Sequence, residues 1–378
     1  MIENKRIYRF FVNILFPLCA FMYLCMTYVN IDIDYQARVS ANRFIFILLL
    51  AIFLLKILYS LRIRKEEIFS LLVLGCFLSL KVIYGDNFSV EYNTLIFLIA
   101  GYLLGSDNTD FLIALITSKV LLLVSTIVLS NLGYLDSNII VKQDQSLVYS
   151  YGFKHTNGLG SLTLSIIIDV ALFIRKKRNN IFFFIILCFF SFFIFYISRS
   201  KTSLILSVLI IFVIFFNNFL FDFFDKSINK NFFSIILVII LIISISLPYF
   251  YQEGVYIWDE LNRIFTLRLF LGNFYINEYG IGYFPQHIEQ LYLQREFDVV
   301  PYYNDNTFLS MILSSGIIIF LLLNIFLLYK QRSKEYSLYV GFLVVISLVS
   351  MIFESNGYNV FLYSPLLFIF NDKVEKVK

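Results

Sequence analysis

The residues of this chain with the clearest chemical potential are arginines in one long polar segment, residues 251–305. Arg263, Arg268 and Arg295 lie there among many aromatic side chains, and the segment ends in Asp-Asn. A guanidinium binds a phosphate or diphosphate through two parallel hydrogen bonds. The segment therefore predicts a site for an anionic, sugar-like ligand. The alternative is an interfacial helix with ordinary arginines and an aromatic belt.

A second group of cations stands in a very short turn, SRSKTS, between two apolar runs. Its charged residues are Arg199 and Lys201. Two interpretations stay open. Either these side chains hold the oxygens of a diphosphate, or they anchor helix ends among lipid headgroups.

Polar residues at the entries of two apolar runs complete the candidate site. Asp305 and Asn306 precede one run, and His155 and Asn157, in YGFKHTNGLG, precede another. Capping a helix is the common role of Asp and Asn at such places. The alternative makes Asp305 or His155 the general base that takes a proton from a sugar hydroxyl, with Asn157 and Asn306 binding the same substrate.

The rest of the chain is too apolar for a soluble domain. Hydrophobic residues make up 60% of 378 positions, charged residues 15%, and the mean hydropathy is +0.81. The bilayer must be the solvent for most of this surface, and backbone groups in lipid must pair within helices. We expect an all-α polytopic membrane protein, a single transmembrane domain over residues 1–378 that contains the large loop 251–305.

About twelve apolar runs are expected to form its helices. The runs at 92–105 and 357–370 are short, so each either re-enters the membrane or crosses where the bilayer is thin. The full set is 7–29, 44–61, 67–84, 92–105, 111–133, 158–174, 181–198, 202–220, 232–250, 307–329, 336–353 and 357–370.

The distribution of Lys and Arg sets the expected orientation. Alternating the runs from an inside N-terminus puts most of these residues inside and both termini in the cytoplasm. The segments 134–157 and 251–305 then face outside, where cations are disfavoured. The long first apolar run lacks a small-residue cleavage pattern, which indicates a membrane helix and not a cleaved signal peptide.

Within the long loop, apolar residues at helical spacing between Leu261 and Phe274 predict one amphipathic helix at the membrane surface. Gly280 and Gly282 predict a turn with close backbone approach.

Several kinds of site are not indicated. The cysteines lie in apolar runs without a C-x-x-C pair, and His155 and His287 are too isolated to form a metal site. No phosphate-binding GxxxxGK[ST] motif occurs. We expect no cofactor and no nucleic-acid partner. Asp169 is expected to reach a helix end, whereas Lys119 lies deeper in its run and has no evident role.

The helical layout, SR-x-x-T at an outer helix end, and a late outer loop that leaves through DN-x-x-L-x-x-x-x-x-x-G-I together resemble the Wzy polysaccharide polymerases. These enzymes share a superfamily of membrane glycosyltransferases with the O-antigen ligases. The resemblance covers most of the chain, mainly as architecture. Arg199 matches the family's first outer arginine, and Arg263 or Arg268 matches an arginine of its large loop.

Two spacings separate the polymerases from the ligases. Polymerases often place ten residues between an arginine and a glycine, whereas eleven separate Arg268 from Gly280. Ligases place ten residues between a histidine and a glycine, and here that spacing joins Asp305 to Gly316. The aspartate at the histidine position favours a polymerase.

The resemblance implies a reaction and its setting. Oligosaccharide units linked to polyprenyl diphosphate would be joined at the outer leaflet of a bacterial cytoplasmic membrane, and polyprenyl diphosphate would leave. The arginines would neutralise its charge, with Asp305 or His155 as base. Membrane lipid is an implied partner, and association with a chain-length regulator stays open. The product could be capsule, O-antigen or exopolysaccharide.

Two other functions compete with this prediction. A ligase would move the glycan to a different acceptor. A flippase or another transporter would place its cations in a cavity between the helices, and the sequence instead places them in outer loops.

Overall fold

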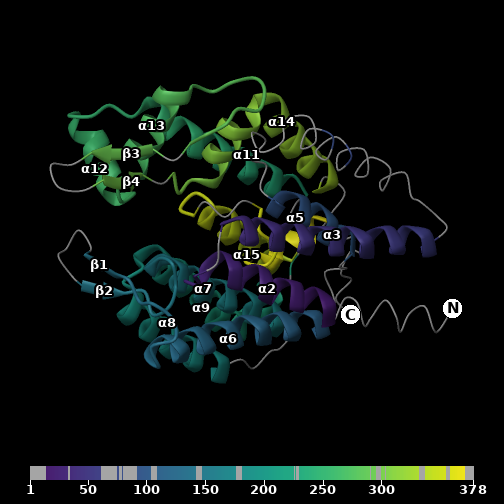
Figure 1. Ribbon diagram of the computed structural model, residues 1–378. Coiled ribbons are helices and arrows are strands. Elements are labelled where there is room, and N and C mark those ends of the chain that lie inside the picture. The colour runs from purple at the N-terminus through teal and green to yellow at the C-terminus, as the bar shows by residue number, and fades with distance from the viewer. Residues whose placement is uncertain are drawn as a thin grey trace.

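The computed structural model of this protein is mostly helical (Figure 1). The predicted run at 67–84 and Arg295 lie outside the described residues. The structure describes residues 14–32, 35–60, 75, 79, 92–103, 109–141, 147–175, 181–224, 226, 230–289, 291–294, 299–302, 304–331, 337–354 and 358–370.

The helices follow most of the predicted apolar runs. They are α2 (Phe16–Tyr28), α3 (Tyr35–Ser60), α5 (Tyr92–Leu103), α6 (Thr109–Asn131), α7 (Thr156–Ile174), α8 (Ile181–Ser198), α9 (Lys201–Phe219), α10 (Phe221–Phe224), α11 (Lys230–Phe250), α12 (Tyr256–Ile264), α13 (Arg268–Tyr279), α14 (Thr307–Gln331) and α15 (Leu338–Ser350), followed by the 3₁₀ helix η3 (Ser364–Phe370).

Among the described residues, five helices are long and apolar enough to cross a membrane: α6, α7, α8, α11 and α14. Shorter apolar helices lie in α2, α3, α9 and α15. The expectation of about twelve spans is therefore not confirmed, whereas the expectation of a mainly helical chain with helices long and apolar enough to span a membrane is met.

Short connections make neighbouring helices antiparallel, so alternate helix ends gather at the same end of the bundle. The end that carries the candidate site collects the start of α7, the α8–α9 turn, the end of α11 and the start of α14. The end of α2 joins it, because Val29 pairs with Phe153 and the Lys154 ammonium donates to the carbonyls of Met26 at 2.5 Å and Thr27 at 2.9 Å.

Two short antiparallel hairpins, not predicted from the sequence, add strands at this end. The pair β1 (Ile139–Val141) and β2 (Leu147–Tyr149) precedes α7, and β3 (Leu291–Gln294) and β4 (Val299–Tyr302) belong to the long loop. Figure 1 shows β3 and β4 beside α12 and α13, apart from the first hairpin.

The last apolar run does not form a membrane-crossing α-helix. It contains the seven-residue 3₁₀ helix η3, and the side chains from Tyr358 to Ile369 are all buried. They pack among α5, α7, α14 and α15. An α-helix of the described length, at 1.5 Å per residue, would fall short of a ~30 Å hydrocarbon core. The segment therefore fills the interior of the bundle.

The expectation that Asp169 reaches a helix end is wrong. Its carboxylate is fully buried and pairs with the Lys119 ammonium at 2.5 Å. The second oxygen accepts a hydrogen bond from the Ser364 hydroxyl at 2.5 Å. This contact links α6, α7 and η3 and gives the deep lysine a structural role.

The long helix α14 is interrupted at Gly316, where φ is 77°. The loop after α13 enters this break: the Ile317 N–H donates to the Gly282 carbonyl at 2.9 Å, and the Gln286 N–H donates to the Ser314 carbonyl at 3.1 Å. A Cβ at position 316 would lie 2.6 Å from the Phe284 carbonyl carbon. The close backbone approach expected at Gly280 and Gly282 occurs instead at Gly316, since a Cβ at position 280 would meet no atom within 4 Å and one at 282 would have only ordinary contacts.

Candidate functional site

The amphipathic stretch of the long loop forms two helices instead of the single helix predicted. Helix α12 ends at Ile264, and α13 begins at Arg268 after Thr266 and Leu267, whose φ values are 51° and 65°. Non-glycine residues rarely adopt this left-handed backbone. The break changes the chain direction between the two loop arginines.

A buried asparagine holds the break in place. The Asn262 carbonyl accepts the Leu267 N–H at 2.9 Å, and its side-chain Oδ1 accepts the Phe270 N–H at 3.1 Å. Its amide donates to the Tyr251 hydroxyl at 3.4 Å, at the end of α11. Because these bonds join α11, α12 and α13, they fix where Arg268 begins its helix. Periodicity alone could not reveal this role.

The two loop arginines have different surroundings. The Arg263 side chain is 77% exposed and pairs with Glu260 at 2.6 Å on its own helix. The Arg268 side chain is only 11% exposed and pairs with Asp305 at 3.2 Å. Its guanidinium also lies 5.7 Å from the centre of the Phe353 ring. Arg268 is thus the loop arginine that reaches the candidate site.

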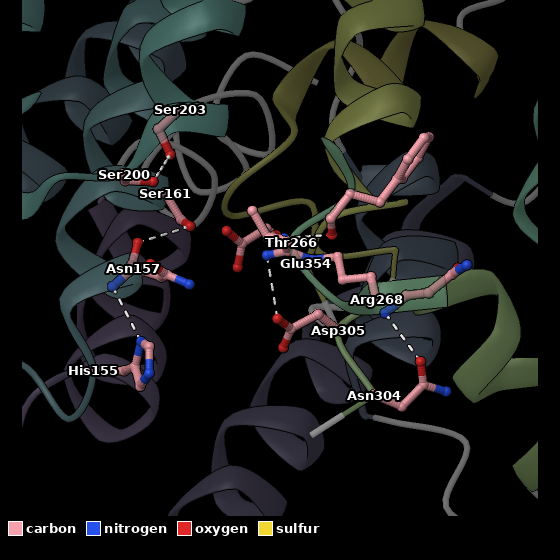
Figure 2. Close-up of polar contacts among 12 residues, drawn as sticks. His155, Asn157, Ser161, Ser200, Ser203, Thr266, Arg268, Asn304, Asp305 and Glu354 are labelled. Carbon is pink, nitrogen blue, oxygen red and sulfur yellow. Dashed lines mark hydrogen bonds and ion pairs between the residues drawn. The ribbon is translucent and has the colours of Figure 1, made fainter. Parts of the chain in front are cut away.

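Asp305 and Asn306 have different roles. Asn306 caps α14, since its Oδ1 accepts the Leu309 N–H at 3.2 Å, and its amide donates to the Ser244 carbonyl of α11 at 2.6 Å. It is buried and structural. The Asp305 carboxylate stays directed toward Arg268 (Figure 2).

Burial and charge act in opposite directions on Asp305. Burial raises the pKa of its carboxyl above the ordinary range, and the nearby Arg268 and His155 side chains lower it by less. His155 and Asp305 come from segments far apart in the sequence, so the tertiary fold brings two predicted site residues into electrostatic contact.

His155, and not Asn157, caps α7. The His155 Nδ1 accepts the backbone N–H of Asn157 at 3.2 Å, which fixes Nδ1 as an acceptor. The ring is exposed, and Asn157 is half-buried beside it. Figure 2 shows both on one side of the site, with Arg268 and Asp305 on the other.

The two cations of the turn between α8 and α9 lie at the surface. Arg199 has a left-handed φ of 51°, is exposed and stacks on the Tyr196 ring with a separation of 5.3 Å. Lys201 is exposed. No contact described for either residue reaches Arg268 or Asp305. Ser200, between them, is buried against Gly160 of α7, where a Cβ would lie 2.6 Å from the Ser200 Cβ.

One acidic residue near the site was missed by sequence reasoning. Glu354 follows α15, is half-buried, and its backbone carbonyl accepts a hydrogen bond from the Thr307 hydroxyl at the start of α14. Figure 2 places its side chain near Arg268. A lone glutamate after an apolar run carries no motif, so only its position at this end of the bundle could have indicated it.

The described residues contain no group of three or more His, Cys, Asp or Glu side chains suited to a metal ion. Comparisons of the chain with protein-family models, with curated proteins and with solved structures find no match. The arrangement of Arg268, Asp305, His155 and Asn157 is therefore the basis for any functional inference.

Proposed function

We propose that this protein is a membrane glycosyltransferase that joins oligosaccharide units carried on a polyprenyl diphosphate, as the Wzy polymerases do. The observation that carries the proposal is the mostly buried Arg268 paired with Asp305 at the end of a membrane-type bundle. His155 and Asn157 face this pair from another part of the chain. The proposal places this end at the outer leaflet of the cytoplasmic membrane and both termini in the cytoplasm.

Arg268 suits a lipid diphosphate because of where its charge is held. Its Nε is buried without a hydrogen-bond partner, and the aromatic ring of Phe353 lies against its guanidinium. A charge held in such partly dry surroundings acts more strongly on an anion than the same charge in water. A diphosphate leaving group gains negative charge as its bond to the sugar breaks, which is the step this guanidinium would stabilise.

The transporter alternative requires cations available between the helices. The deeply buried Lys119 is neutralised by Asp169 and closed off by the η3 segment. This pair supports a structural role and leaves the outer-end site as the better basis for function.

A glycan ladder tests the proposal with a matched pair of arginines. We expect Arg268→Ala to abolish high-mass polymer and to accumulate single lipid-linked units, whereas Arg263→Ala, in the same loop, should leave the ladder near wild type. Membrane levels of each variant are checked in parallel.

A normal ladder in Arg268→Ala cells would exclude the proposed site. Polymer that forms but never reaches its final acceptor in cells lacking the protein would instead indicate the ligase function. Equal loss in both arginine variants would point to a general effect of loop charge.

A further inference from the structure

The segment that follows α15 is held over the first turn of α14. The Thr307 N–H donates to the Met351 carbonyl at 2.9 Å, and the Thr307 hydroxyl donates to the Glu354 carbonyl. The side chain between them, Phe353, stacks on Phe265 of the long loop with ring centres 5.5 Å apart. The backbone of Glu354 is therefore anchored at the start of α14.

This anchoring sets Glu354 beside the charged pair. The Phe353 ring that precedes it lies against the Arg268 guanidinium, and Asp305 stands two residues before Thr307. Figure 2 shows the Glu354 side chain directed into the space between Arg268 and Asp305 on one side and Asn157 on the other. The side chain is half-buried, so substrate entering that space would meet it.

The neighbouring carboxylate, Asp305, balances a positive charge. Asp305 is an ion-pair partner of Arg268 at 3.2 Å, so a proton accepted by Asp305 would remove the negative charge that balances the buried guanidinium. The same Asp305 serves as the counter-charge of Arg268 until a diphosphate arrives. This end of the bundle therefore carries one carboxylate that balances Arg268 and a second, Glu354, that can take the proton of an acceptor hydroxyl.

We propose that Glu354 is the general base of the transfer and that Asp305 is the counter-ion of Arg268. This inference rests on the proposed glycosyltransferase function. Under this inference Glu354 is the base, in place of Asp305 or His155, which the sequence predicted. His155 keeps its role as the cap of α7.

The step balances without any further reactant. The hydroxyl oxygen of the acceptor sugar forms a bond to the anomeric carbon of the donor sugar, and the bond from that carbon to the phosphate oxygen breaks. The bonding electron pair leaves on the diphosphate, next to Arg268. The hydroxyl proton passes to the Glu354 carboxylate and then to water.

Steady-state transfer between lipid-linked units in membranes separates the two carboxylates. We expect Glu354→Gln to lower kcat by roughly 100-fold or more, with KM within a few-fold of wild type and without the fall in kcat at acidic pH. Asp305→Asn keeps an acceptor oxygen for Arg268, so it should retain that acidic fall in kcat and lower KM modestly. Glu354→Asp, which keeps a carboxylate on a shorter side chain, should recover part of kcat.

Glu278→Gln, an exposed carboxylate on α13, serves as the control and should match wild type. The inference is overturned if Glu354→Gln keeps its kcat and acidic pH dependence while Asp305→Asn loses activity. Failure of the proposed function looks different: wild-type membranes would then form no polymer from lipid-linked units, or Arg268→Ala would be fully active.

Discussion

Two ion pairs that contain an aspartate lie in different regions of this molecule, and the difference in their exposure gives them different roles. Lys119 and Asp169 are completely shielded from solvent in the bundle interior, and Ser364 occupies the second carboxylate oxygen. Arg268 and Asp305 lie at the loop-covered end, where Asp305 remains 32% exposed. A closed pair can only hold helices together, whereas an open pair can exchange one partner for a ligand.

The largest effect is expected at the closed pair. Lys119→Met should cost about 3–5 kcal/mol, because it leaves the Asp169 carboxylate buried without its counter-charge. The measurement is thermal unfolding and yield in detergent. Combining Lys119→Met with Asp169→Leu should restore most of the loss. If Lys119→Met alone were as stable as wild type, water would have to reach the Asp169 carboxylate.

At the open pair, a change of the cation should affect activity more than folding. Arg268→Lys keeps the charge but loses the planar fork that binds two phosphate oxygens. Transfer should fall by roughly 10- to 100-fold, equivalent to about 1.4–2.7 kcal/mol in the barrier, with an unfolding temperature close to wild type. Kinetics and thermal unfolding on the same preparation measure both. Unfolding at a much lower temperature would make Arg268 structural, like Lys119.

The break in α14 allows a test of how the loop is held over the open pair. Gly316→Ala adds a Cβ at a positive φ and 2.6 Å from the Phe284 backbone. The substitution should loosen the docked loop at a cost of about 1–3 kcal/mol, seen as faster proteolysis of residues 280–289 in membranes. Gly254→Ala is the control, since its φ of 81° is similar but open space surrounds it. Equal proteolysis of both variants would assign the effect to backbone strain alone.

The smallest predicted effect is a pH dependence of ligand binding at the open pair. Because burial raises the pKa of Asp305 above the ordinary aspartate range, acidification protonates it sooner than an exposed aspartate. The neutral form no longer competes for Arg268, so affinity for a lipid-linked diphosphate should rise as pH falls through that pKa. Binding titrations at several pH values measure it. Asp305→Asn should remove the dependence, and an unchanged dependence in that variant would place its origin elsewhere.

Sequence reasoning named segments that the fold brings together at the candidate site, but not the pairings between their residues. The loop arginines, Asp305 and the entry to α7 were all identified from charge placement. Spacing left Arg263 and Arg268 equivalent, since both fitted one amphipathic helix. The structure separates them because Asn262 and the left-handed residues Thr266 and Leu267 end that helix between the two arginines.

What the sequence by itself determined is the membrane-type helical character, most helix positions and the end of the bundle at which polar chemistry gathers. These follow from local apolar runs and from the alternation of successive helices, which need no knowledge of distant contacts. Only the tertiary structure decided that Arg268 meets Asp305, that Lys119 meets Asp169, and that the last apolar run fills the interior. Each of these depends on residues tens to hundreds of positions apart, and on packing that no single segment encodes.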